Sequence, residues 1–413
     1  MSYLRTRWVI AGLLCAATTI NYIDRQTLSI LSPLLRKEFH LTDQDYANIV
    51  TAFLIPYTVM YSLGGRIMDR LGVRLGLTLS LAWWSLATVF SAFARSGFSL
   101  GLSRFLLGIG EPCVYPAGVK VCGEWFPSRL RATATGIFSS GSSIGALVAP
   151  PMIAFLTLHF GWRSAFFVSG ILGLLWLPFW WAFYRPLHFH PAVARGDIAD
   201  IEADRLHQQP APTYRELLRH KSIWGLMIAR LLSDPVWYFY LFWLPDYLQR
   251  ERGLTLAQVG IYGWIPFLFA DLGSIGGGFL SDLLVRKGIP PQRARLILLA
   301  AVGVLAPLGA LAGIAPTLTT TIAVTCLVAA LTQCWSANTA TLAADLVPNA
   351  ATASVFGMMG TAGSLAGAVF AQLLGFIIGH FGYPAAFALA ACLHPIAAIV
   401  LWTTVKQKRL EFT

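Results

Sequence analysis

Twelve mostly apolar stretches, each longer than 20 residues, follow one another along this chain of 413 residues. A helix needs ~20 apolar residues to cross the ~30 Å hydrocarbon core of a bilayer. The predicted spans are 8–34, 46–68, 75–95, 99–121, 132–158, 164–184, 221–248, 257–282, 294–314, 317–340, 352–380 and 384–405. The sequence therefore predicts an all-α polytopic membrane protein with twelve transmembrane helices.

The charge content excludes most soluble classes of protein. Charged residues make up 12% of the chain, against ~25% in soluble domains. The net charge of +11 would suggest nucleic-acid binding only if the basic residues clustered on one soluble surface. They lie instead in short gaps between apolar stretches, so we expect the lipid bilayer, and no nucleic acid, as a partner.

The six cysteines show no CxxC pair and no metal-ligand spacing with histidines. We expect no disulfide, no metal site and no cofactor. The motifs that an enzyme would carry, such as HExxH or a phosphate-binding loop, are also missing from the sequence, and we expect no enzymatic activity.

Lysine and arginine are distributed unevenly between the two sides of the predicted bundle. If both termini are cytoplasmic, 21 of the 30 basic residues fall on the cytoplasmic side and six on the other. Such an excess is typical of cytoplasmic loops. We therefore predict a multi-pass membrane protein with both termini in the cytoplasm.

One sizeable polar gap, residues 185–220, divides the apolar stretches into two sets of six. It predicts an N-terminal half at 1–190, a cytoplasmic linker at 191–220 and a C-terminal half at 221–413.

Two short patterns recur in both halves. Gly65 and Asp69, four residues apart, are matched 213 residues later by Gly278 and Asp282. Trp125-Phe-Pro127 is matched by Leu346-Val-Pro348 at an offset of 221. Two echoes near half the chain length predict duplicated six-helix units that are pseudo-symmetric.

Several motifs resemble those of a known family of transporters. Gly65-x-x-x-Asp69-Arg70-x-Gly72-x-Arg74 is similar to the loop between helices 2 and 3 of the major facilitator superfamily (MFS). The segments Asn21-Tyr-Ile-Asp-Arg25, Arg104-Phe-Leu-Leu-Gly-Ile-Gly-Glu111-Pro112 and Trp125-Phe-Pro127-Ser-Arg129-Leu-Arg131 resemble its anion:cation symporter family. Arg230-Leu-Leu-Ser-Asp234-Pro-Val-Trp237 looks closest to bacterial hexuronate carriers.

The resemblance implies a monomeric transporter of the MFS fold in a bacterial inner membrane. It implies proton-driven symport of a small organic anion, a sugar acid such as glucuronate or galacturonate. By the same resemblance Asp24 and Glu111 would carry protons, Arg25 would bind the anion, and Tyr57 would contact substrate. The galactonate branch has a glutamine at the position of Ser142, so this serine fits the hexuronate carriers better.

The charged residues inside the predicted helices support an anion carrier on physical grounds. Asn21, Asp24 and Arg25 lie at i, i+3 and i+4 and share one helix face. Arg104 and Glu111 lie two turns apart, ~10 Å along their helix, too far for a direct pair. Each must find its partner on another helix or on the substrate. Arginine grips a carboxylate with two parallel hydrogen bonds, although permanent structural ion pairs are the alternative.

Other polar and aromatic residues are weaker candidates for substrate contacts. Close helix packing is the alternative explanation for each of them. These candidates are Tyr22, Tyr57, Ser142, Trp237 and Tyr238.

Two further groups of charged residues have different expected roles. Arg230 and Asp234 form an i, i+4 pair, expected to be structural, with Pro235 as a helix break. Asp69, Arg70 and Arg74 resemble the gating latch of the superfamily and should lie outside the binding site.

Alternatives to a hexuronate carrier stay open. An aldonate or an aromatic acid would suit the same arginines. A drug/proton antiporter of the same fold would need cavity acids without paired arginines, which Arg25 and Arg104 argue against.

Overall fold

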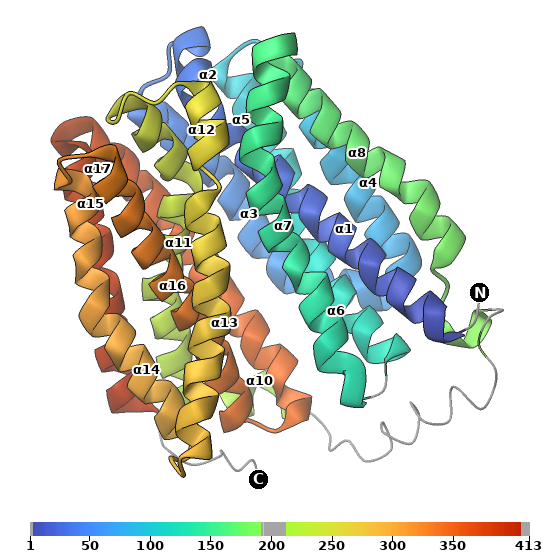
Figure 1. Cartoon of the computed structure of the whole chain (residues 1–413). Coiled ribbons are helices and arrows are strands. Elements are labelled where there is room, and N and C mark those ends of the chain that lie inside the picture. Colours follow the sequence, from blue (N-terminus) through green and yellow to red (C-terminus); the bar gives the residue numbers. More distant parts are fainter. Residues whose placement is uncertain (1–2, 127, 191–192, 194–211, 406–413) are drawn as a thin grey trace. The chain divides into compact units, whose positions relative to one another are not determined.

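A computed structural model describes residues 3–126, 128–190, 193 and 212–405. The helices of residues 3–190 are α1 (Tyr3–Ile30), α2 (Ser32–Phe39), α3 (Asp43–Leu71), α4 (Val73–Ser91), α5 (Gly97–Gly110), η1 (Glu111–Cys113), α6 (Val114–Trp125), α7 (Ser128–Phe160), α8 (Trp162–Phe183) and η2 (Leu187–Phe189). Those of residues 212–405 are α10 (Tyr214–Leu217), α11 (Lys221–Arg250), α12 (Leu256–Tyr262), α13 (Ile265–Arg286), α14 (Pro291–Leu305), η3 (Ala306–Ala310), α15 (Leu311–Ile314), α16 (Leu318–Leu346) and α17 (Asn349–Thr404) (Figure 1).

Every predicted apolar stretch is helical, and the twelve-helix prediction is confirmed. Four of the predicted spans run from one helix into the next: α1 into α2, α5 into α6, α12 into α13, and α14 into α15. The last two spans form the single element α17, which bends at Gly382, where φ is 73°. Glycine tolerates this left-handed conformation, and Pro384 beyond it favours a helix start.

One detail of the sequence prediction is wrong. Pro235 does not break its helix, since α11 continues through both Pro235 and Pro245 to Arg250. Proline removes one backbone hydrogen bond, and transmembrane helices tolerate that loss where neighbouring helices pack around them.

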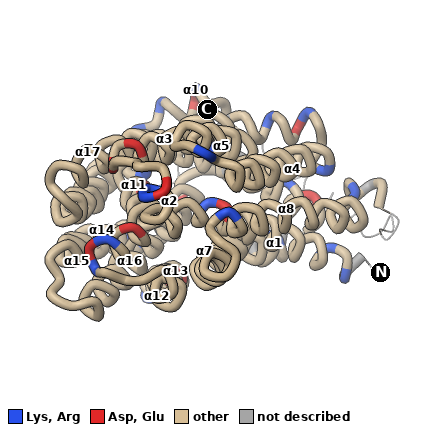
Figure 2. The backbone as a smooth tube through the Cα atoms, turned by 90° about the horizontal axis from the view of Figure 1, so that it is seen from above, with Lys and Arg blue, Asp and Glu red and all other residues tan. Residues whose placement is uncertain are grey.

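Several of the longer described helices are apolar enough to lie in a bilayer. By length and composition, seven of the described helices could cross a membrane, and α17 counts once among them although Gly382 divides it. The bent pair Asp43–Tyr61 and Leu63–Leu71 would add an eighth. Charged residues are sparse along the backbone tubes (Figure 2).

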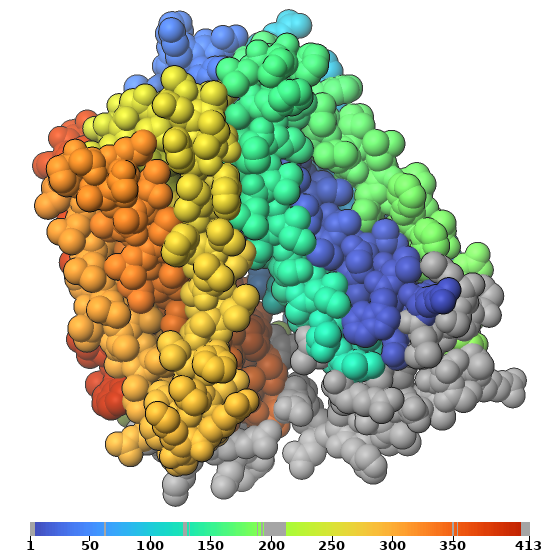
Figure 3. Space-filling view, in the orientation of Figure 1, coloured from blue at the N-terminus to red at the C-terminus, as the bar shows by residue number. Residues whose placement is uncertain are grey.

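The chain divides into two compact units. The first unit comprises Met1–Phe39, Ala52–Gln208 and Thr255–Ile261, and the second comprises His40–Thr51, Gln209–Leu254 and Tyr262–Thr413. In the first unit α1 packs along α7, and α4 packs against α5 and α8. Figure 3 shows α1 and α7 in direct contact along much of their length. The sequence boundaries at residues 190 and 221 stay a prediction.

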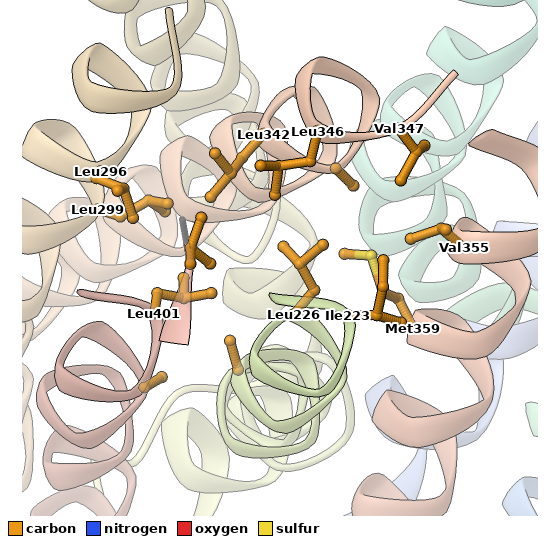
Figure 4. Packing of buried hydrophobic residues seen from close by; sticks show 14 of the residues in the cluster. Ile223, Leu226, Leu296, Leu299, Leu342, Leu346, Val347, Val355, Met359 and Leu401 are labelled. Carbon is orange, nitrogen blue, oxygen red and sulfur yellow. The ribbon is translucent and has the colours of Figure 1, made fainter. Parts of the chain in front are cut away.

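In the second unit α11 packs along α17, and α13 along α16. A buried apolar cluster joins α11, α16 and α17 to α14. Figure 4 shows part of this cluster, with Leu226 of α11, Leu299 of α14, Leu342 of α16 and Met359 of α17.

The two units repeat one packing device. In the first, a methyl group added at Gly141 of α7 would overlap the backbone oxygen of Cys15 in α1. In the second, a methyl group at Gly363 of α17 would overlap the Asp234 carboxylate of α11. Gly141 and Gly363 are 222 residues apart, so each unit seats its first long helix against small residues at the corresponding point.

Candidate functional site

A buried ion pair joins α1 to the end of α5 in the first unit. The Arg25 guanidinium donates to one carboxylate oxygen of Glu111, from Nη2 at 2.7 Å and from Nε at 3.2 Å. Arg25 is 5% exposed and Glu111 is fully buried. Both charges are therefore removed from solvent and depend on each other.

Asn21 adds a third member to this pair. Its side-chain oxygen accepts from Arg25 Nη2 at 3.2 Å, and its amide nitrogen donates to the backbone oxygen of Glu111 at 3.4 Å. The i, i+4 spacing of Asn21 and Arg25 on α1 permits the first of these bonds. Asn21 and Arg25 therefore share one face of α1, as predicted, and Asn21 helps to position the Arg25 guanidinium.

The backbone around Glu111 explains how its side chain reaches α1. α5 ends at Gly110, and Glu111–Cys113 form one 3₁₀ turn before α6 begins. Pro112 has no N–H to continue the α-helical ladder, and Ser80 Oγ donates to the Gly110 oxygen at 2.6 Å. A methyl group at Gly108 would overlap the Phe53 backbone oxygen, so α3 approaches closely here.

Three aromatic rings surround the Arg25 guanidinium. Its central carbon lies 4.9 Å from the ring centre of Tyr57, 5.0 Å from Tyr22 and 5.4 Å from Phe53. Rings at these distances stabilise a cation through their negatively polarised faces. Phe53 was not predicted from the sequence, because nothing in its spacing distinguishes it from lipid-facing phenylalanines.

Asp24 lies next to Arg25 in sequence but in a different environment. It is fully buried, and neither carboxylate oxygen has a geometrically well-formed hydrogen bond to any described residue. The hydroxyls of Thr88 and Ser169 lie near this carboxylate, and both donate to backbone oxygens of their own helices. The Arg104 guanidinium donates to the backbone oxygen of Asp24 at 3.1 Å, so the partner that Arg104 was expected to find on another helix is on α1.

Ser142 of α7 is half-buried. Its hydroxyl donates to the backbone oxygen of Ser139 at 2.7 Å, and its neighbour Gly141 is in tight contact with α1. A substrate contact for Ser142 stays a prediction.

The remaining predicted contacts lie in the second unit. Trp237 packs edge-on against Phe267 at 5.9 Å between ring centres. Tyr238 stacks on Phe242 at 6.1 Å and packs over Gly367. Both side chains are partly exposed, and their role in substrate binding stays a prediction.

The predicted pair on α11 is present. Arg230 Nη2 lies 3.1 Å from Asp234 Oδ2, and Arg230 Nη1 donates to Ser336 Oγ of α16 at 3.0 Å. This arrangement ties α11 to α16 and fits the expected structural role.

The three predicted latch residues make separate contacts. Asp69 pairs with Lys120 of α6 at 2.6 Å, and that lysine also donates to the Met68 backbone oxygen. Arg70 is exposed, and Arg74 donates to the Trp181 backbone oxygen at 2.7 Å. Lys120 was missed as a partner, because the sequence marks it only as one more basic residue.

The second unit carries a counterpart of the Asp69 pair. Arg295 of α14 lies 2.8 Å from Asp282 of α13 and 3.5 Å from Asp345 of α16. Asp282 is the residue that repeats Asp69 in sequence.

Twelve apolar helices in two repeated sets, with charged side chains buried among the helices of each set, define a polytopic membrane transporter. The chain belongs to the Major Facilitator Superfamily, whose sequence profile matches residues 14–371. This confirms the family resemblance of the motifs, and the relatives are transporters, not enzymes.

Curated relatives of similar length carry sugar acids. The "Hexuronate transporter" of Escherichia coli (strain K12) is 30% identical over 97% of this chain and 94% of its own length. The "Galacturonate transporter" of Dickeya chrysanthemi is 32% identical over 67% of this chain and 82% of its own. The "Probable galactarate/D-glucarate transporter GarP" of Escherichia coli (strain K12) is 30% identical over 71% and 70%.

Solved structures of low sequence identity share the fold. A D-xylose-proton symporter superposes with a TM-score of 0.78 at 18% identity, covering 99% of this chain and 100% of its own. A bacterial homologue of the human lysosomal transporter Spinster gives 0.72 at 21% identity, covering 97% and 95%.

Proposed function

We propose that this protein carries a hexuronate, such as glucuronate or galacturonate, across a bacterial inner membrane together with protons. Its curated relatives with that printed activity are 30% and 32% identical. The observation that carries the proposal is the buried Arg25–Glu111 pair with aromatic rings around the guanidinium.

Arg25 is suited to hold the carboxylate of a sugar acid. A guanidinium stays charged at every physiological pH and offers several donors in a fixed plane. In the present arrangement Glu111 occupies two of those donors. A substrate carboxylate can take the same donors only when Glu111 withdraws.

Protonation supplies the reason for that withdrawal. A neutral Glu111 loses most of its attraction to Arg25, and the charged substrate then becomes the better partner. After release of substrate, Glu111 gives up its proton and pairs with Arg25 again. Each anion thus moves with at least one proton, which links transport to the pH gradient.

Asp24 is proposed as the second proton carrier. A buried carboxylate without hydrogen bonds is costly in its charged form, by several kcal/mol. Asp24 fits this description, since it is fully buried and its oxygens accept no well-formed hydrogen bond from the described part of the chain. Arg104 donates a hydrogen bond to the backbone oxygen of Asp24. Its guanidinium is therefore close enough to interact electrostatically with the Asp24 carboxylate.

The remaining predicted residues would recognise the sugar. Asn21, Tyr22 and Tyr57 lie around Arg25, and their amide and hydroxyl groups suit the ring hydroxyls of a hexuronate. Trp237 and Tyr238 of the second unit are proposed as further contacts to a hexuronate during the transport cycle.

A Glu111→Gln variant tests the coupling. Glutamine has the shape of the protonated acid and cannot release a proton. The variant reconstituted in vesicles should still exchange labelled hexuronate for unlabelled hexuronate across the membrane. It should lose accumulation driven by an imposed pH gradient, and Asp24→Asn should show a partial form of that defect.

Two outcomes would contradict the proposal. Accumulation by Glu111→Gln at the wild-type level would leave Glu111 as a structural partner of Arg25. Exchange of a neutral hexose at the same rate as the corresponding hexuronate would show that the substrate carboxylate is not needed for transport.

A further inference from the structure

A cavity of about 430 Å³ opens in the first unit where α8 ends and α4 begins. It lies apart from the Arg25–Glu111 site, at the ends of both helices. Its walls include Leu71, Arg74, Leu75, Trp181, Arg185 and Phe189.

Two arginines bring uncompensated positive charge to this cavity. Neither Arg74 nor Arg185 pairs with a carboxylate in the described part of the chain. Arg74 is held in place, with Nη2 donating to the Trp181 backbone oxygen and its guanidinium 4.2 Å from that indole ring. Its Nε is buried and has no hydrogen-bond partner among the residues that the structure describes. The site therefore offers one guanidinium that is fixed by Trp181 and a second one, Arg185, that is exposed.

The rest of the cavity wall is apolar and open. Phe189 is 79% exposed and Trp181 is 42% exposed, and Leu71 and Leu75 are exposed beside them. A small inorganic anion gains nothing from these side chains. A molecule with an anionic head and a hydrocarbon body uses both the arginines and the apolar wall.

The place of the cavity along the helices points to the same ligand. Val73–Ser91 and Trp162–Phe183 are both long and apolar enough to cross a membrane, and the cavity lies where the first begins and the second ends. Tryptophan and arginine concentrate at this depth, where headgroups meet hydrocarbon. By the lysine and arginine distribution this is the predicted cytoplasmic side, and basic pockets between helices on that side bind anionic headgroups.

We propose that this cavity binds the headgroup of an anionic phospholipid. The phosphate accepts hydrogen bonds from Arg74 and Arg185, as guanidinium and phosphate groups match in geometry. The glycerol and upper acyl chains lie against Leu75, Trp181 and Phe189.

Native mass spectrometry of the purified full-length protein tests the proposal. Dioleoyl-phosphatidylglycerol and dioleoyl-phosphatidylcholine, which differ only in headgroup, are titrated separately, and affinity should favour phosphatidylglycerol. Arg185→Gln, an exposed position that leaves folding intact, should weaken phosphatidylglycerol binding about fivefold. The Arg74→Gln/Arg185→Gln double variant should lose about 25-fold, with phosphatidylcholine binding unchanged.

Arg286→Gln is the matched control, because Arg286 is an exposed arginine at the end of α13 and outside the cavity. It should bind phosphatidylglycerol as the wild type does. Equal affinity for the two lipids, or an undiminished preference in Arg185→Gln and the double variant, would overturn the proposal. Millimolar inorganic phosphate that displaces phosphatidylglycerol and raises the thermal midpoint as much as the lipid does would reassign the cavity to free phosphate.

Discussion

The contacts of Arg25 depend on the planar shape of its guanidinium as well as on its charge. Two of its nitrogens donate to Glu111, and Nη2 also donates to Asn21. Lysine at this position keeps the charge and loses the planar fork. Arg25→Lys should therefore weaken binding of a hexuronate by about 10-fold or more, the size of one hydrogen bond to a charged group.

Equilibrium binding to purified protein, measured by thermal shift or calorimetry, checks this prediction. Arg163→Lys, at an arginine whose side chain is 51% exposed, is the matched control and should bind normally. Wild-type affinity in Arg25→Lys would mean that a point charge is sufficient.

Also at the scale of residues, the sequence predicted which residues belong to the site. It did not predict which of them form pairs. Asn21 and Arg25 could be placed together because one helix fixes their spacing. The partnership of Arg25 with Glu111 joins residues 86 positions apart, and it depends on how α1 packs beside the end of α5. Helical periodicity holds no information on that contact, so the sequence could only say that each charge needs a partner elsewhere.

At the scale of helices, small residues decide which helices approach closely. A methyl group at Gly141 would overlap the Cys15 backbone oxygen, and backbone cannot turn aside as a side chain does. Gly141→Ala should force α1 and α7 apart and lower the free energy of unfolding by about 1–3 kcal/mol. Thermal unfolding in detergent measures the effect.

Gly136→Ala provides the matched control on the same helix. Nothing lies within 4 Å of the methyl group that this change adds, and alanine favours a helix over glycine by roughly 0.5–1 kcal/mol. Its thermal midpoint should equal or exceed that of the wild type. Similar midpoints for the two variants would show that the contact between α1 and α7 adapts freely.

Helix continuity was harder to predict than helix position. Pro235 and Pro384 look alike in sequence, yet α11 passes through the first and α17 bends just before the second. The difference is Gly382, whose positive φ turns the chain, whereas helices packed around α11 compensate for the bond that Pro235 removes. A proline alone therefore does not specify a break.

For the whole molecule, the two units repeat in packing but differ in charge. Residues 221 positions beyond Arg104 and Glu111, the offset of one sequence echo, are Thr325 and Thr332. Both threonines are buried and uncharged. Duplication thus explains why the helices and their close glycine contacts recur in both units. The Arg25–Glu111 pair proposed for coupling has no counterpart at the matching position of Glu111 in the second unit.

The Asp69–Lys120 pair provides a prediction for the transport cycle. It joins α3 to α6 at 2.6 Å, and the Asp69 side chain is 70% exposed. Exposed pairs contribute about 0–1 kcal/mol, so Asp69→Asn should leave the thermal midpoint nearly unchanged. Binding of hexuronate should also persist, because neither residue contacts Arg25 or Glu111. The rate of transport should fall about fivefold, the factor that ~1 kcal/mol represents.

Lys120→Gln removes the same pair from its other side and should reproduce the defect. The exchanged variant, Asp69→Lys with Lys120→Asp, restores opposite charges and should recover part of the rate. Transport and equilibrium binding are measured on the same preparations, which separates a slow cycle from a damaged site. Wild-type rates in both single variants would show that this loop orients the chain in the membrane without taking part in its movement.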